Sequence, residues 1–96
     1  MIEFHELALV ELRQAQAWYR GKSQGVAERF FRQTRRAVER LLIDPASQPV
    51  IGRGCHYLRI SRFPFVLIYR VRSHDDVFVI AVAHTSRRRG YWRSRK

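Results

Sequence analysis

The sequence of 96 residues predicts an α+β domain in which a helical hairpin packs on a small antiparallel sheet, in the order β-α-α-β-β-β. Two observations predict this class. Apolar residues recur at helical spacing through the first half of the chain, and they alternate or run continuously, as in strands, through the second half. Chains divide into domains only when they are much longer, so residues 1–96 are expected to form one domain.

The first half is predicted to contain a short strand and two helices. Residues 2–5 alternate, and the helical pattern then runs over 6–20 until the glycines of 21–25 end it. Ser23 is placed to cap a second helix over 24–43, which ends because the residue before Pro45 disfavours helix. The expected apolar faces are Ala8, Leu12, Ala15 and Tyr19, flanked by Trp18, and Phe30, Thr34, Ala37, Val38 and Leu41, widened by Phe31 and Leu42.

The second half is predicted to be a loop followed by three strands. Residues 44–55 hold two prolines and two glycines and are expected to be the loop, before a strand over 56–61. Strands over 63–72 and 77–84, joined by the polar residues 73–76, form an antiparallel hairpin. The first of these two strands has one face of Phe65, Leu67, Tyr69 and Val71 and another of Val66, Ile68, Arg70 and Arg72.

The strand over 77–84 is apolar on both faces, but one helical hairpin can cover only one face of the sheet. Two interpretations stay open. The uncovered face forms an apolar groove, of the kind that usually marks a partner site on a protein surface. Alternatively, Tyr91 and Trp92 fold back and fill it.

The chain is strongly basic, with 19 Lys and Arg against 8 Asp and Glu and a formal net charge of +11. Of the basic residues 17 are arginines, whose planar guanidinium suits phosphate and carboxylate groups and stacks on bases. This charge indicates an acidic partner, which is a nucleic acid, an enzyme bound to nucleic acid, or an acidic protein.

Cysteine and histidine usage predicts neither a disulfide nor a metal site. Cys55 is the only cysteine, and the histidines are scattered, so no zinc-binding spacing exists and no cofactor is expected. The N-terminal stretch carries three glutamates and no long apolar run. We therefore expect no signal peptide, no membrane span and a cytoplasmic location.

Two basic regions are candidate binding surfaces. The segment AHTSRRRGYWRSR (83–95) directly follows the last predicted strand, and its mixture of arginines and aromatic residues suits phosphate contact combined with base stacking. The second helix carries an arginine stripe opposite its apolar face, either as a solvated surface with Glu28 and Glu39 as partners or as an electrostatic track. Target contacts are expected from Arg87, Arg88, Arg89, Tyr91, Trp92 and Arg93, and the stripe consists of Arg29, Arg32, Arg36 and Arg40.

Several segments together resemble a known superfamily. They are AWY (17–19) near the end of the first helix, the proline after the second helix, RFPFVLIYRV (62–71) and VFVIAVAHTSRRRGYW (77–92). The chain resembles the RelE/ParE superfamily, the toxin subunits of type II toxin–antitoxin modules, often called plasmid stabilisation proteins.

The resemblance implies a toxin with two alternative targets. RelE-like members cut messenger RNA on the ribosome, whereas ParE-like members inhibit DNA gyrase and have no nuclease site. Both are neutralised by an acidic, partly disordered antitoxin that wraps along the helices and into the sheet. The expected partners are therefore a cognate acidic antitoxin and either gyrase or the ribosome with its mRNA. The antitoxin contacts are expected to include Arg29, Arg32, Arg36, Arg40, Val66 and Ile68.

Cleavage of RNA by its own 2′-hydroxyl needs a base, an acid and a cation for the phosphorane. His84 suits acid or base chemistry because its ordinary pKa is about 6.5. Arg62 lies close to His84 if the last two strands pair around 73–76. Arg87 or Arg88 would help to hold the phosphate, and Tyr91 would stack on a base or donate a proton.

One position departs from the nuclease pattern. RelE-like nucleases usually carry a basic residue inside this strand motif, where the present chain has Val66 in FVLIY, and the typical preceding lysines are absent. The sequence therefore favours a ParE-like gyrase inhibitor. The alternatives are a ribosome-dependent endoribonuclease and a basic nucleic-acid-binding module without toxicity.

Overall fold

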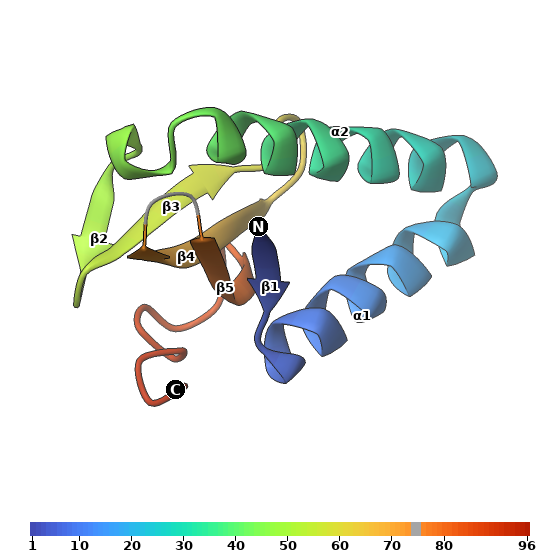
Figure 1. The fold of residues 1–96 in the computed structure, drawn as a ribbon. Coiled ribbons are helices and arrows are strands. Elements are labelled where there is room, and N and C mark those ends of the chain that lie inside the picture. The colour runs from blue at the N-terminus through green and yellow to red at the C-terminus, as the bar shows by residue number, and fades with distance from the viewer. Residues whose placement is uncertain (74–75) are drawn as a thin grey trace.

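The computed structural model describes residues 1–73 and 76–96. Two helices pack on one face of a five-stranded sheet with the strand order β1-β5-β4-β3-β2 (Figure 1). The elements in chain order are β1 (Ile2–Phe4), α1 (Glu6–Lys22), α2 (Gln24–Ile43), a short 3-10 helix η1 (Pro45–Ser47), β2 (Val50–Gly52), β3 (Cys55–Arg59), β4 (Phe65–Ser73) and β5 (Asp76–His84).

The α+β class and the helical hairpin on a sheet are confirmed, with two corrections to the sheet. It is mixed rather than antiparallel, because β1 runs parallel to β5 while the other neighbouring pairs are antiparallel. The predicted loop over 44–55 also contains η1 and the three-residue edge strand β2, too short to give an alternating pattern. Of the predicted turn, His74 and Asp75 lie outside the described residues.

Ser23 joins the two helices. Its backbone N–H donates to the carbonyl of Tyr19 at the end of α1, and its Oγ accepts from the N–H of Val26 at 3.0 Å, so the predicted cap of the second helix is confirmed. The glycine-based end of the first helix is wrong, because α1 continues through Gly21 to Lys22 and Ser23 is its C-cap.

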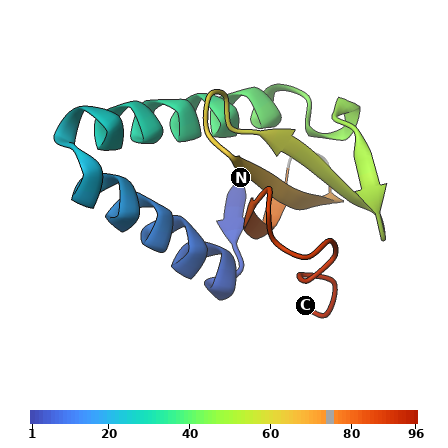
Figure 2. The same ribbon diagram turned by 180° about the vertical axis from the view of Figure 1, so that it is seen from behind.

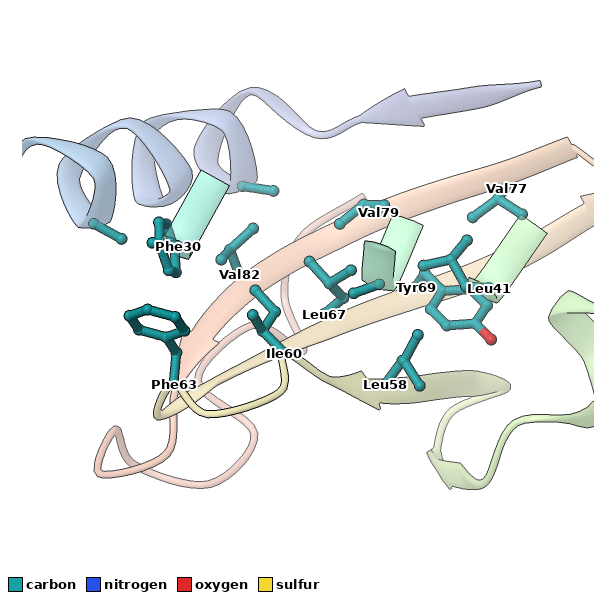
Figure 3. Packing of buried hydrophobic residues seen from close by; sticks show 13 residues of the cluster. Phe30, Leu41, Leu58, Ile60, Phe63, Leu67, Tyr69, Val77, Val79 and Val82 are labelled. Carbon is teal, nitrogen blue, oxygen red and sulfur yellow. The ribbon is translucent and has the colours of Figure 1, made fainter. Parts of the chain in front are cut away.

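The main core lies between the helices and the sheet (Figure 3). Phe30, Leu41 and Leu67 are fully buried in it, and Phe30 stacks at an angle against Tyr19 at 4.9 Å between ring centroids. The predicted apolar faces of the helices are confirmed at Tyr19, Phe30 and Leu41. Phe31 and Trp18 are corrections, because they are 55% and 62% exposed and do not widen the buried faces.

A β-bulge interrupts β5, both faces of which are apolar. Ile68 pairs with Ala81 and Tyr69 with Val79, so Ile80 is an extra residue in β5. Ile80 and Ala81 consequently belong to the same apolar cluster, on the face of the sheet away from the helices. The expectation that this strand is buried on both faces is confirmed.

Candidate functional site

The C-terminal segment (residues 85–96) folds back over the face of the sheet that the helices leave uncovered (Figures 1 and 2). Trp92 is only 4% exposed and packs in one cluster with Ile68, Ile80 and Ala81. Of the two interpretations of the second apolar face, filling by the C-terminal aromatics is therefore the one observed. Trp92 was expected to contact the target. As a correction, its side chain is buried in this structure and anchors the C-terminal segment.

A carboxylate on α1 fixes this segment in place. Both oxygens of Glu11 accept from the Arg95 guanidinium at 2.9 Å, and Oε2 also accepts from the Tyr91 hydroxyl at 2.6 Å. Oε1 accepts in addition from the backbone N–H of Val82 at 3.0 Å. The side chains of Glu11 and Arg95 are each only 11% exposed. We call Glu11, Tyr91 and Arg95 the latch.

The latch also satisfies an open sheet edge. Strand β1 stops pairing with β5 after Val79, whose carbonyl accepts from the N–H of His5. Beyond that point the Val82 N–H donates to Glu11 and the Ile80 carbonyl accepts from Arg95 at 3.0 Å. Two side chains thus satisfy backbone groups that a neighbouring strand would otherwise pair, as buried backbone groups require.

The protonation states in the latch follow from its geometry. Burial alone raises the pKa of Glu11, but the hydrogen bonds from Arg95, Tyr91 and Val82 outweigh it and lower the pKa below its ordinary value of 4.5. Burial, together with the hydrogen bond to Glu11, raises the pKa of Tyr91. Glu11 is therefore ionised and Tyr91 neutral at pH 7.

The sequence did not single out Glu11, and Arg95 entered only as the last residue of the candidate segment 83–95, with no partner assigned. Both were visible as charged residues, but Glu11 lies in a helix with charged neighbours, where a solvated position is the usual interpretation. Only the tertiary fold brings residue 95 against residue 11. A usable indication was Tyr91, because a buried tyrosine needs a hydrogen-bond partner.

His84 lies at the end of β5, beside a cavity of about 270 Å³. Its Nδ1 accepts from the N–H of Ser86 at 3.0 Å and lies 2.7 Å from the Ser86 hydroxyl oxygen. The imidazole packs edge-on against Phe65 with 5.1 Å between the ring centroids. The structure brings His84, Arg87, Arg88, Arg89, Tyr91, Trp92, Val66 and Ile68 together around this cavity.

Arg62 lies in the turn before β4, at the same end of the sheet as His84. Phe65 pairs with His84, and the N–H of Thr85 donates to the Pro64 carbonyl, so the predicted pairing of the last two strands is confirmed. Arg62 itself is exposed, with a φ of 70°, and lies outside the lining of the His84 cavity.

The arginines of the C-terminal segment differ in their surroundings. The Arg87 guanidinium lies 3.9 Å from the centre of the Tyr91 ring, which is a cation–π contact. Arg88, Arg89 and Arg93 are exposed. Arg87 and the Glu11 hydrogen bond together hold Tyr91 in place, which limits its freedom to stack on a base.

The arginine stripe of α2 is solvent-exposed along its length, and within residues 1–73 and 76–96 none of its members forms an ion pair. Two sheet residues were expected to share its role. Val66 is half-buried, whereas Ile68 is 3% exposed and lies in the cluster with Trp92, so Ile68 is not accessible in this structure. The stripe consists of Arg29, Arg32, Arg36 and Arg40.

A groove of about 510 Å³ runs between the two helices. Phe31 lines it together with Arg20 and Arg32, and Glu28 is the one acidic residue in the lining. A large exposed aromatic ring beside two cations suits a partner with apolar and acidic side chains.

No helix in the described part of the chain is both long and apolar enough to cross a membrane. Among residues 1–73 and 76–96, no three histidine, cysteine, aspartate or glutamate side chains gather as metal ligands.

Comparison with known proteins gives the family. No curated protein sequence matches the chain. The family model described as the ParE toxin of the type II toxin–antitoxin system parDE matches residues 2–89, which spans β1 to the arginines after β5. The chain therefore belongs to the ParE toxin family of type II toxin–antitoxin systems.

Proposed function

We propose that this ParE-family chain inhibits DNA gyrase in the cytoplasm and that a cognate acidic antitoxin neutralises it. The observation that favours gyrase inhibition over RNA cleavage is that Tyr91 is already bound to Glu11. Its hydroxyl donates to Glu11 at 2.6 Å, and its raised pKa opposes proton release. Apolar Val66 lines the cavity where RelE-like nucleases usually carry a basic residue.

One observation favours the endoribonuclease as the second candidate. His84, Arg87 and Arg88 line one cavity, which supplies an acid–base group and two cations for a phosphate. Arg62 is absent from that lining, and Tyr91 is held by Glu11. Membership of a toxin family favours both toxin activities over a non-toxic nucleic-acid-binding module.

Inducible expression with transcript mapping separates the two activities. We expect growth arrest with a DNA-damage response and intact transcripts, and we expect His84→Ala and His84→Gln to remain toxic, because gyrase inhibition needs no proton transfer at residue 84. The glutamine variant keeps a hydrogen-bond acceptor for Ser86 but cannot relay protons. Codon-dependent transcript cuts that disappear in both variants would establish the nuclease instead.

We place the antitoxin in the groove between α1 and α2. This surface combines the exposed Phe31 ring with Arg20 and Arg32, and the arginine stripe of α2 continues from Arg32 along the helix. An acidic, amphipathic segment would bury apolar side chains on Phe31 and direct carboxylates to the arginines. The C-terminal segment lies on the other side of the sheet and is left for the target.

A further inference from the structure

A second cavity of about 270 Å³ lies on the face of the sheet that carries the C-terminal segment. Arg70 lines it, and in β4 this residue is closer to Ser73, which pairs with Asp76, than to Phe65, which pairs with His84. The basic lining of the cavity comes from the β2–β3 turn, β4 and the C-terminal segment, and Cys55 of β3 and Ile80 of β5 complete the wall. Its basic residues are Arg53, Arg70, Arg93, Arg95 and Lys96.

The charge in this cavity is largely uncompensated. Arg95 is neutralised by Glu11, and the nearby Arg72 is neutralised by Glu3 at 2.8 Å and by Asp76 at 3.3 Å. Arg53, Arg70 and Arg93 form no ion pair within the described chain, and the lining contains no acidic residue. Burial raises the pKa of Cys55 in the cavity wall, so the neutral thiol supplies no negative charge.

Three elements hold these guanidinium groups around one hollow, although like charges repel. The arrangement is fixed by features that serve the fold, since Arg53 sits in a tight turn with a φ of 52° and Arg70 lies over the Phe78 ring. Trp92, which anchors the C-terminal segment, forms part of the same wall. A bound anion would remove the repulsion and accept hydrogen bonds from several arginines at once.

We propose that this cavity binds a phosphate group. A phosphate presents several oxygens and up to two charges, which matches three uncompensated arginines better than the single charge of a carboxylate does. The phosphate comes from a small phosphorylated compound or from a nucleic acid. This site shares Trp92 with the His84 cavity but none of its basic residues, and its occupancy does not depend on the identity of the toxin target.

The test is a titration of the purified full-length chain with inorganic pyrophosphate in about 0.15 M salt, where long-range attraction is screened. Trp92 fluorescence in a Trp18→Phe background reports on this face of the sheet, because Trp92 lines the cavity and Trp18 is 62% exposed elsewhere. Trp92 also lines the His84 cavity, so the Arg70 variant assigns the signal to the proposed site, because Arg70 lines only the second cavity. We expect saturable one-to-one binding that Arg70→Gln weakens about tenfold, as loss of a charge-assisted hydrogen bond predicts. Arg93→Gln, at an exposed position, is expected to weaken binding similarly.

Arg13→Gln is the matched control, because Arg13 is exposed on α1, lies outside the cavity and carries the same charge. Its affinity for pyrophosphate should equal that of the parent. Absence of saturable binding, or an equal loss in Arg13→Gln, would overturn the proposal. If a single-stranded oligonucleotide displaces pyrophosphate, and this displacement is lost in Arg70→Gln, the phosphate belongs to a nucleic acid. If pyrophosphate binds and the oligonucleotide does not displace it, the phosphate belongs to a small compound.

Discussion

Replacing Glu11 with alanine is expected to lower the free energy of unfolding by about 3–5 kcal/mol, because it leaves a buried guanidinium without its counter-charge. Arg95 is only 11% exposed and gives both terminal nitrogens to Glu11. The Tyr91 hydroxyl and the Val82 N–H lose the same acceptor. Urea unfolding of the purified chain, followed by circular dichroism, measures the change.

Glu39→Ala is the matched control for this prediction. The Glu39 side chain is 65% exposed, and its Oε2 lies 3.7 Å from Nε of Arg35. Its loss should therefore lower the free energy of unfolding by no more than about 0.5 kcal/mol. The double variant Glu11→Ala, Arg95→Met should lose less stability than the two single losses combined, because no unpaired charge remains buried. Equal effects of Glu11→Ala and Glu39→Ala would contradict the latch.

The latch also predicts how stability depends on pH. The folded-state pKa of Glu11 lies below its ordinary value of 4.5, so the contribution of Glu11 is complete above that pH and is lost as the pH falls through the folded pKa. The stability difference between the parent and Glu11→Ala should therefore shrink below about pH 4.5. A difference that stays constant from neutral to strongly acidic pH would argue against an ionised Glu11.

Replacing Phe31 with alanine is expected to weaken antitoxin binding at least about thirtyfold, a loss of affinity typical of an aromatic hot spot. Toxicity should stay intact. Phe31 is 55% exposed and lines the groove between the helices, so the substitution removes contact area for the partner but little of the core. Calorimetry with the cognate antitoxin measures the affinity.

Ile43→Ala provides the control for that experiment. Ile43 is the last residue of the same helix, is 84% exposed and lies outside the groove. Its substitution should leave antitoxin affinity unchanged. If Phe31→Ala binds as tightly as Ile43→Ala, the antitoxin occupies another surface, and the groove assignment fails.

Local sequence patterns predicted the helices and the last two strands well. The bounds of α2 agree with the prediction of 24–43, because an apolar stripe, a serine cap and a proline stop all indicated them. The faces of β4 were also right, since strict alternation allows one assignment only. Short or irregular features were missed, namely strand β2 and the bulge at Ile80, because neither changes the local apolar pattern.

The long-range polar contacts could not be predicted from the sequence. Glu11 and Arg95 are far apart along the chain, and each is an ordinary charged residue in its local context. Their pairing depends on β1 ending at Phe4 and leaving the edge of β5 open, which is a property of the assembled sheet. The same holds for the cavity of Arg53, Arg70 and Arg93, since its three elements meet only in the tertiary fold.

Supercoiling of relaxed plasmid by purified gyrase, in the presence of this purified chain, tests the central claim most directly. We expect the chain to inhibit supercoiling, the antitoxin to relieve the inhibition, and His84→Ala to inhibit as the parent does. Uninhibited supercoiling by gyrase from the matched host, together with cleavage of mRNA on purified ribosomes that requires His84, would contradict the claim.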